Sequence, residues 1–431
     1  MSTSEVRVSA PVNIAITKYW GKLDELNIHP VNSSISMTLN QDQVFPLLSE
    51  YIYQLMTTTR LVTGPDLTNS SFSLNGRMYE DVPGRIKDVI IIAQLRARLA
   101  GRTNVYPHLC IESINSFPTA AGLASSASGL AALAFGLTKL YRLDEDPPSL
   151  ARRGSGSACR SLYGGFVHWI RSNDTLCSTG GSQTHCSTVH ELYPASYWPE
   201  LKVLICVASS HKKSTGSTTG MQRTVNTSQL FQRARCESVK QHELLLLSAL
   251  RDRDFENFAR IAMQESNQLH AVCLDTWPPC IFLTDVSLKL MNWVHLLNRF
   301  CGKTVVAYTF DAGPNAFLFA EESNVSFLLH LLALCFGTKS CETTLDVPSS
   351  DHVYVTDPVD TMAKSLLFRG IKYPVYSRPI DTCFIHFDAI FKEAVRVPQR
   401  LRAAALLLAA DGIPLCRSIS PRNLDFRTDM S

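Results

Sequence analysis

The sequence predicts an α/β fold large enough for two to three lobes, and three observations support this prediction. The chain has 431 residues, 45% of them hydrophobic, which is ample for a large core at about 150 residues per domain. Short segments rich in β-branched residues recur along the chain between longer segments with helical spacing. A strand-like segment at 105–114 and an apolar helical segment at 130–141 flank a stretch of small residues at 118–129.

Composition and charge exclude several classes of function. The 41 basic and 38 acidic residues leave a formal net charge of +3, which is too balanced for a nucleic-acid-binding or membrane-surface protein. Any anion site must therefore be local. The 13 cysteines are odd in number and scattered, which favours reduced thiols in the cytosol over a disulfide framework or a zinc site. No apolar run approaches the roughly 18 residues of a membrane-spanning helix.

The first predicted strand, residues 6–16, alternates in polarity and is rich in β-branched residues. At its end lie two lysines, Lys18 and Lys22, around the aromatic pair Tyr19 and Trp20. Lysines suit binding to a polyanion because each is a compact donor with a full charge. A solvated hairpin is the alternative interpretation of this segment.

An unusual apolar segment, residues 44–53, follows a second strand predicted at 35–40. Seven of its residues are apolar or aromatic, whereas an insertion at a hairpin is normally polar. We interpret the segment either as an extra flap outside the functional site or as a gene-model error. A strand resumes near 55–59, an Asn-Gly turn precedes Arg77, and residues 86–99 have the spacing of an amphipathic helix.

The small-residue stretch at 118–129 carries the main functional signal, and it reads Pro-Thr-Ala-Ala-Gly-Leu-Ala-Ser-Ser-Ala-Ser-Gly. Small side chains let the backbone approach a ligand, and the free N–H groups of a helix start, with the hydroxyls of Ser125, Ser126 and Ser128, suit phosphate. The stretch is neither a Walker loop nor a dinucleotide fingerprint, because Gly-Lys-Ser/Thr and Gly-x-Gly-x-x-Gly are missing. A tight helix-packing contact with an N-cap is the alternative.

The next predicted helix, residues 149–162, contains a Gly-Ser-Gly-Ser run that ends at Ser157. A glycine within a helix costs about 1 kcal/mol of helix stability relative to alanine, so two glycines in this helix indicate a role other than helix formation. Close approach of a ligand is one, and Ser155, Ser157 and Arg160 would then donate to its phosphate or carboxylate oxygens. A frayed helix with a surface arginine is the alternative.

The second half of the chain again alternates strands and helices. A strand at 201–208 leads to a loop in which Ser217 and Thr218 cap the next helix, hold a phosphate, or do both. A later strand, residues 304–310, runs into Asp311-Ala-Gly-Pro, which without context would be a turn. The remaining predictions are three helices packed behind a sheet, at 228–250, 255–270 and 284–300, a helix at 324–336, a strand at 370–376 and a helix at 400–410.

These motifs together resemble the galactokinase, homoserine kinase, mevalonate kinase and phosphomevalonate kinase (GHMP) superfamily, in the form used by the mevalonate diphosphate decarboxylase family. The resemblance runs from residue 6 to residue 319, apart from 44–53, and thins beyond it. The matching stretches occur in the same order along the chain, at residues 10–22, 32–34, 118–127, 152–165, 215–221 and 307–316.

The resemblance implies a role for each motif. Asp311 would be the catalytic carboxylate, with Lys18 near it, and would orient a substrate hydroxyl and accept its proton. The implied substrate-binding residues are Tyr19, Trp20, Gly21, Lys22, Arg77, Ser155, Gly156, Ser157, Ala158, Cys159, Arg160 and Thr218. The implied ATP phosphate-binding residues are Ala121, Gly122, Leu123, Ala124, Ser125, Ser126 and Ser128. No residue is assigned as a metal ligand.

The resemblance also implies an architecture and a reaction. We expect a two-lobed α/β (α+β) GHMP kinase-like fold, with a ribosomal-S5-like lobe at 1–200, a ferredoxin-like lobe at 201–376, a divergent tail at 377–431 and an active site in the cleft between lobes. The implied reaction is ATP-dependent decarboxylation of (R)-5-diphosphomevalonate to isopentenyl diphosphate in isoprenoid and sterol biosynthesis, with Mg²⁺, in a cytosolic homodimer. A GHMP small-molecule kinase and a non-catalytic binding relative are the alternatives.

We predict that deleting residues 44–53, by joining Gln43 to Gln54, raises soluble yield and melting temperature and leaves kcat unchanged. An exposed apolar segment with β propensity favours association, and Pro46 and Glu50 reduce that hazard without removing it. The measurement compares yield, Tm and kcat of the two proteins. Loss of activity in a folded deletion variant would instead make the segment a working lid.

Overall fold

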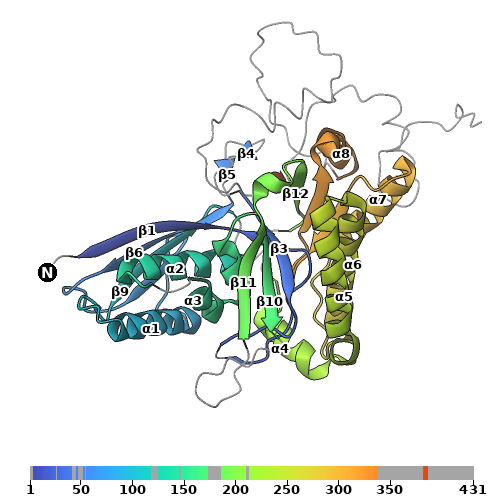
Figure 1. The fold of residues 1–431 in the computed structure, drawn as a ribbon. Helices are drawn as coiled ribbons and strands as arrows, with labels where there is room; N and C mark the ends of the chain where they lie inside the picture. Colours follow the sequence, from blue (N-terminus) through green and yellow to red (C-terminus); the bar gives the residue numbers. More distant parts are fainter. Residues whose placement is uncertain are drawn as a thin grey trace, which may run out of the picture.

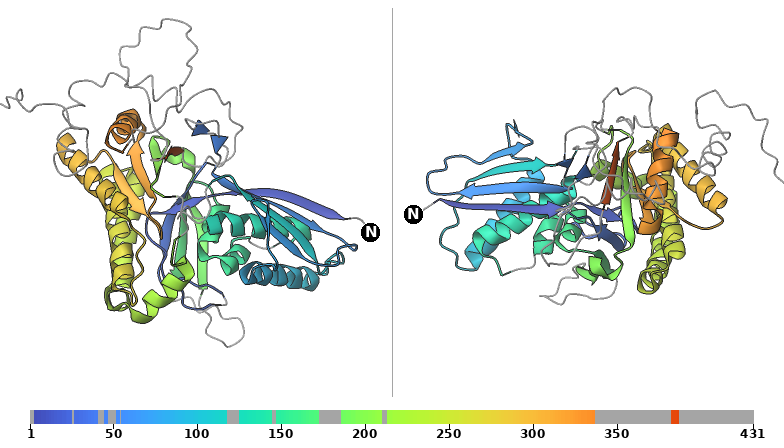
Figure 2. Two further views of the ribbon diagram at one scale, coloured as in Figure 1. Left: turned by 180° about the vertical axis from the view of Figure 1, so that it is seen from behind. Right: turned by 90° about the horizontal axis from the view of Figure 1, so that it is seen from above.

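The computed structural model describes residues 3–25, 27–40, 45–46, 52–53, 55–117, 125–144, 147–172, 186–209, 213–336 and 382–386. Figure 1 shows the elements of the N-terminal half on one side of the molecule and the long helices of the C-terminal half on the other. Both views of Figure 2 show the same separation, with the strands that join the two halves between them. Within these described ranges, no helix combines the length and apolar character that crossing a membrane requires.

The N-terminal half is built on a five-stranded sheet in the order β1-β6-β9-β7-β8. Strand β6 (Met56–Thr63) pairs antiparallel with β1 (Ser4–Pro11) and with β9 (Leu109–Asn115). Strands β7 (Ser71–Leu74) and β8 (Arg77–Met78) complete it. Burial alternates strictly along β6, which means that one face of the sheet is covered and the other is open.

Three helices cover the buried face of this sheet: α1 (Gly84–Leu99), α2 (Ser125–Tyr141) and α3 (Pro147–Gly154). The middle of α2 is rich in buried alanine, which lets the helix lie close to the strands. A Cβ atom on Gly136 of α2 would lie 2.7 Å from the side chain of Leu61, so the helix is as close as a glycine permits.

A second sheet, in the order β11-β10-β3-β2, lies between the two halves. Its strands are β2 (Asn13–Ala15), β3 (Ser34–Thr38), β10 (Phe166–Ser172) and β11 (Cys186–Tyr193). Every residue of β2 and β3 is buried. The segment that carries Lys18 therefore leaves from the interior of the molecule.

The third sheet, in the order β13-β14-β12-β15, forms the C-terminal half. Its strands are β12 (Leu201–Val207), β13 (Ala307–Phe310), β14 (Ala316–Glu321) and β15 (Thr382–His386). The helices of this half are α4 (Ser217–Thr227), α5 (Cys236–Asp252), α6 (Phe255–Asp275), α7 (Asp285–Cys301) and α8 (Glu322–Phe336). One core unites residues of β12 to β14 with residues of α5, α6 and α7, which confirms the prediction that three helices pack behind this sheet.

Two predicted elements were wrong in their extent. The strand predicted at 6–16 is two strands, because the chain leaves one sheet at Pro11 and enters another at Asn13. The helix predicted at 149–162 ends at Gly154 and resumes as a 3₁₀ helix, η1 (Gly156–Leu162), after Ser155 adopts an extended conformation. Gly156 follows the break, and a Cβ atom on it would lie 2.6 Å from the hydroxyl of Tyr19, so packing requires a glycine there.

Several predictions fall wholly or partly outside the described residues. In the apolar segment at 44–53, β4 (Phe45–Pro46) pairs with β5 (Ile52–Tyr53), and the rest lies outside the description. The strand predicted at 370–376 and the helix predicted at 400–410 also lie outside it.

We predict that Gly165→Ala destabilises the protein far more than Gly76→Ala. Both glycines have positive φ, +62° and +76°, so an alanine at either should cost about 1–2 kcal/mol of backbone strain. At Gly165 the new Cβ would also lie 2.2 Å from the carbonyl oxygen of Tyr193, whereas at Gly76 it meets nothing within 4 Å. Denaturant unfolding should show at least about 1–3 kcal/mol of additional loss for Gly165→Ala, and equal losses would contradict the prediction.

Candidate active site

A cavity of about 400 Å³ opens between the two halves of the chain. Residues after β2, the starts of α1, α2 and η1, the start of α4 and the end of β13 line it. Its predicted lining residues are Lys18, Tyr19, Trp20, Lys22, Ser125, Ser126, Ser155, Gly156, Ser157, Arg160, Thr218 and Asp311. The structure thus brings together residues that are up to 293 positions apart in sequence.

The centre of the cavity is an ion pair between Lys18 and Asp311. Lys18 follows β2 and is 1% exposed, whereas Asp311 follows β13 and is 25% exposed. The Lys18 ammonium donates to Oδ1 of Asp311 at 2.7 Å and to the carbonyl oxygen of Ala15 at 2.7 Å. Burial lowers the pKa of Lys18, and the charges of Asp311 and Glu265 oppose that shift. The pair leaves the Asp311 carboxylate facing the cavity beside a fixed cation.

Arg160 is the second buried cation of the site and lies on η1. Its guanidinium donates to Oγ of Ser34 at 2.7 Å and to Oδ1 of Asn13 at 3.4 Å, and it lies 5.7 Å from the ring centre of Trp169. Asn13 in turn donates to the carbonyl oxygen of Ser157 at 3.1 Å. Burial lowers the pKa of Arg160. The side chain is therefore rigidly held, with a donor available to the cavity.

The aromatic pair after Lys18 forms the wall of the cavity. The ring of Tyr19 packs on Trp169 with 4.7 Å between centroids, and the indole N–H of Trp20 donates to Oγ1 of Thr224 at 3.1 Å. Gly21 has φ +98°, and a Cβ atom there would lie 2.8 Å from Phe231, so this glycine is required by the backbone and does not line the cavity.

The predicted phosphate loop is described from Ser125 onward, and Ala121 to Ala124 lie outside the described residues. Ser125 and Ser126, at the start of α2, line the cavity. Ser128 does not, because it is fully buried and bonded to Oγ1 of Thr57 at 2.6 Å. A helix start with two hydroxyls beside a cavity is suited to a phosphate group.

Three other predicted site residues lie away from the cavity. Ala158 and Cys159 are fully buried in η1, and the Cys159 thiol donates to the carbonyl oxygen of Gly156 at 2.9 Å. Arg77 is exposed on β8, with its guanidinium 6.0 Å from the ring centre of Tyr79. Their contact with a substrate stays a prediction.

Several lining residues were missed at the level of the sequence. Lys213 lines the cavity and donates to the carbonyl oxygen of Ala312 and to Oγ of Ser217, each at 2.8 Å. Arg85, at the start of α1, donates to Oγ1 of Thr218 and so joins the two halves. The other missed residues are Asn13, Ala15, Gly216, Met221, Leu269 and Ala312, whereas Ser217, predicted to cap the helix or hold a phosphate, lines the cavity as well. Asn13 could have been found, because it is a polar residue inside an apolar strand. Nothing in the local sequence around Arg85 indicated that it lines the cavity.

The cavity is strongly cationic although the whole chain is nearly neutral. Its lining cations are Lys18, Lys22, Arg85, Arg160 and Lys213. Among the described lining residues, the only carboxylate is Asp311. In the described part of the chain, no group of three or more His, Cys, Asp or Glu residues could hold a metal ion. The cavity is therefore suited to a polyanionic ligand with one hydroxyl to be activated.

One histidine packs directly behind the ion pair. His270 of α6 is almost fully buried, with its ring 6.4 Å from that of Phe282 and 6.3 Å from that of Phe310. Burial and the positive charge of Lys18 lower the pKa of His270 to about 4, in spite of the charge of Asp311. The imidazole is therefore neutral at physiological pH.

The chain matches two family models and several characterised proteins. A diphosphomevalonate decarboxylase-like N-terminal domain matches residues 10–180, and a mevalonate 5-diphosphate decarboxylase C-terminal domain matches residues 203–378. The chain is 44% identical over 332 residues to the human diphosphomevalonate decarboxylase, which covers 74% of this chain and 78% of the human one.

Two solved structures share the fold. One is mevalonate diphosphate decarboxylase from Trypanosoma brucei, with a TM-score of 0.67, 33% identity and coverage of 76% of this chain and 83% of that one. The other is MDDEF in complex with MVAPP, AMPPCP and magnesium, with a TM-score of 0.65, 32% identity and coverage of 77% and 93%. This likeness confirms the predicted α/β fold class.

We predict that His270→Phe makes stability less sensitive to acid. Because the folded-state pKa of about 4 lies below the ordinary value of 6.5, the unfolded chain binds the proton first as pH falls. The wild type should therefore lose about 2 kcal/mol of unfolding free energy from this group between about pH 7 and pH 5, at about 1.4 kcal/mol per pKa unit. Urea unfolding at both pH values checks this, and an equal loss in His270→Phe would contradict it.

Proposed function

The chain belongs to the diphosphomevalonate decarboxylase family, and from this premise we propose that the cationic cavity is its active site, with Asp311 and Lys18 as the catalytic residues. The protein catalyses the ATP-dependent decarboxylation of (R)-5-diphosphomevalonate to isopentenyl diphosphate, phosphate, ADP and carbon dioxide. The reaction belongs to the mevalonate pathway of isoprenoid biosynthesis. The observation that supports our assignment most strongly is the Lys18–Asp311 pair at the centre of the cavity.

The first chemical step is phosphoryl transfer to the tertiary hydroxyl of the substrate. The Asp311 carboxylate orients this hydroxyl and accepts its proton as the oxygen bonds to the γ-phosphorus of ATP and ADP leaves. Lys18 fixes the carboxylate through its 2.7 Å contact, so that the free oxygen of Asp311 faces the substrate. Positioning and charge stabilisation supply most of the catalysis in such transfers.

The second step converts the phosphorylated hydroxyl into a leaving group. The C–O bond breaks and phosphate leaves, while the electrons of the C–C bond to the carboxylate form the alkene and carbon dioxide is released. The departing phosphate is stabilised by the lining cations, of which Lys18 and Lys213 face Asp311. Arg160 and the hydroxyls of Ser155 and Ser157 hold the diphosphate or the carboxylate of the substrate.

ATP binds with its phosphates at the start of α2, where Ser125 and Ser126 line the cavity. Mg²⁺ accompanies the ATP and screens the phosphate charges. The magnesium and AMPPCP of the related MDDEF complex support this part of the proposal.

The proposal also covers the ligand class, the cellular location, the oligomeric state and the boundary between the lobes. The protein acts on small molecules, as a cytosolic homodimer, and its lobes divide near residue 200. The strand β12, which begins the third sheet at Leu201, supports this division. The 13 cysteines, odd in number and scattered along the sequence, support a reducing compartment.

The activity is tested by measuring carbon dioxide release in the presence of ATP and diphosphomevalonate, with omission of either as the control. Isopentenyl diphosphate, ADP and phosphate should form in equal amounts. A GHMP kinase would instead accumulate the phosphorylated substrate and release no carbon dioxide.

We predict that Asp311→Asn lowers kcat by at least about a hundredfold, the scale usual for a positioned base. Asparagine keeps an oxygen that accepts from Lys18 but cannot take the proton, so ATP and substrate binding should change by less than about twofold. Asp285→Asn, on the exposed start of α7, is the matched control. Near wild-type turnover of Asp311→Asn would remove Asp311 from the catalytic role.

A further inference from the structure

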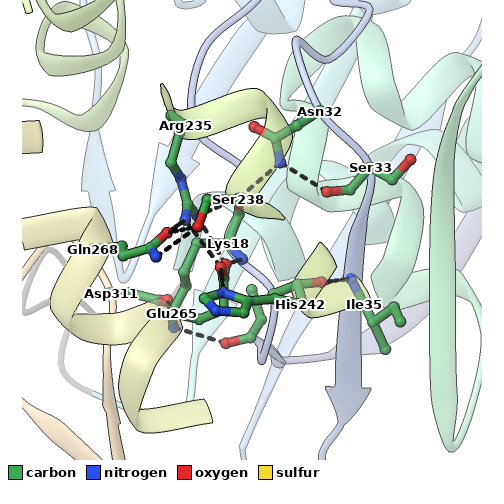
Figure 3. A network of polar contacts seen from close by, with 12 residues as sticks. Lys18, Asn32, Ser33, Ile35, Arg235, Ser238, His242, Glu265, Gln268 and Asp311 are labelled. Atoms are coloured by element: carbon green, nitrogen blue, oxygen red, sulfur yellow. Dashed lines mark hydrogen bonds and ion pairs between the residues drawn. The ribbon is translucent and has the colours of Figure 1, made fainter. Parts of the chain in front are cut away.

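A buried carboxylate, Glu265 of α6, lies behind the catalytic pair and is completely enclosed. Its Oε2 accepts from the backbone N–H of Lys18 and from Arg235, each at 2.8 Å. Its Oε1 accepts from Arg235 at 2.9 Å and lies 2.6 Å from Nδ1 of His242 (Figure 3). Both oxygens are therefore fully used.

Arg235 is itself held by several contacts. It donates to Oε1 of Gln268 at 2.7 Å, and Gln268 bonds in turn to Ser238 (Figure 3). Arg235 is the last residue of a π-helical segment, η3 (Phe231–Arg235), that leads into α5. Such segments are rare and are frequent at functional sites.

Neither Glu265 nor Arg235 lines the cavity, and both contact Lys18, which does. The C-terminal half holds Lys18 at three points. Glu265 accepts from its backbone N–H, Asp311 accepts from its ammonium, and Arg235 donates to its carbonyl oxygen at 3.5 Å. Asn32 donates to its carbonyl oxygen at 3.0 Å. A shift of Glu265 would therefore move the whole catalytic lysine.

We propose that Glu265, paired with Arg235, is a positioning residue that fixes Lys18 against Asp311 for the chemical step. This inference rests on the proposed function. Burial by itself raises the pKa of Glu265, but the charge of Arg235 and the bonds from His242, Arg235 and Lys18 lower it to about 2. The carboxylate is thus charged throughout the working pH range.

The charge of Glu265 also acts on the protonation of Lys18. Asp311 and Glu265 raise the pKa of Lys18, whereas burial and Arg160 lower it. The neutral His270 and the cation Arg235, which donates to the Lys18 carbonyl oxygen, also face Lys18. The ion pair with Asp311 requires the ammonium form. Loss of the Glu265 charge therefore moves the fall in activity at high pH to lower pH.

The test is Glu265→Gln in the full chain, with steady-state kinetics across pH. The amide NH₂ of glutamine then replaces either Oε2, which accepts from the Lys18 N–H and Arg235, or Oε1, which contacts Arg235 and His242. In both orientations the charge is lost and Arg235 loses one acceptor. We expect kcat to fall at least about tenfold, KM for ATP and substrate to stay within about twofold, and the high-pH limb of kcat to shift downward. Hydrogen exchange of the peptide spanning residues 13–22 should become faster.

Glu243→Gln is the matched control, because Glu243 also forms a buried pair with a histidine, His168, at 2.7 Å. It lies away from the cavity and should change neither the pH limb nor the exchange at residues 13–22. If Glu265→Gln kept wild-type kcat and pH profile, the pair would be only structural and the proposal would be overturned.

A second variant covers the case in which Glu265→Gln does not fold, since it leaves Arg235 as an unpaired buried cation. Arg235→Met with Glu265→Leu replaces the whole pair by apolar side chains, which is often neutral for stability. This variant should fold, lose kcat and show the faster exchange at Lys18. Wild-type kcat in the folded double variant would also overturn the proposal.

Failure of the proposed function looks different from failure of this inference. If the wild type released no carbon dioxide, the proposed function would fail, whatever the variants did. If the wild type were active and hydrogen exchange at residues 13–22 were unchanged in Glu265→Gln, the positioning role alone would fail.

Discussion

Lys18 is a cation with almost no exposed surface, and its only charged partner for the ammonium among the described residues is a carboxylate from the other half of the chain. Removing an ion from water costs several kcal/mol, which only a close partner and satisfied hydrogen bonds can offset. The two halves must therefore meet at this point. The contact between Lys18 and Asp311 holds the end of β2 against the end of β13, and it also positions the proposed catalytic carboxylate.

Glu265 extends this constraint deeper into the C-terminal half. It binds the Lys18 backbone on one side and Arg235 on the other, so charge alternates from Asp311 through Lys18 and Glu265 to Arg235. Each of these four charges has an opposite neighbour. The cavity differs, because its described lining residues include five cations and one carboxylate. That imbalance opposes folding through repulsion, and it is relieved when a polyanionic ligand binds.

Close packing sets the shape of the site as firmly as charge does. Gly156 admits the ring of Tyr19, and Gly21 allows a backbone conformation that turns Trp20 under the cavity. The alanines of α2 bring its start, with Ser125 and Ser126, close to the sheet and beside the substrate residues. Small residues therefore shape the site in two ways. The glycines permit the backbone conformation and the close contact with Tyr19, and the alanines let α2 pack close to the sheet.

Local patterns in the sequence predicted much of this protein. Helical spacing located α1, α2, α6 and α7 to within a few residues, because amphipathic periodicity reflects burial on one face. The lysines and small residues of the motifs around Lys18 and Ser157 predicted an anion site, and the catalytic role of Asp311 was implied by the family resemblance. The sequence could not show that residues 6–16 change sheets, since both strands have the same local pattern.

What remained was decided by tertiary structure alone. Arg85 reached the cavity, and Ser128 turned away from it toward Thr57, through the packing of whole helices rather than through any nearby residue. The Glu265–Arg235 pair had no motif, because its meaning depends on a lysine more than two hundred residues away. The sequence by itself determined which residues could bind phosphate and transfer a proton. Only the folded chain decided which of them share one cavity, because that depends on distances across three sheets.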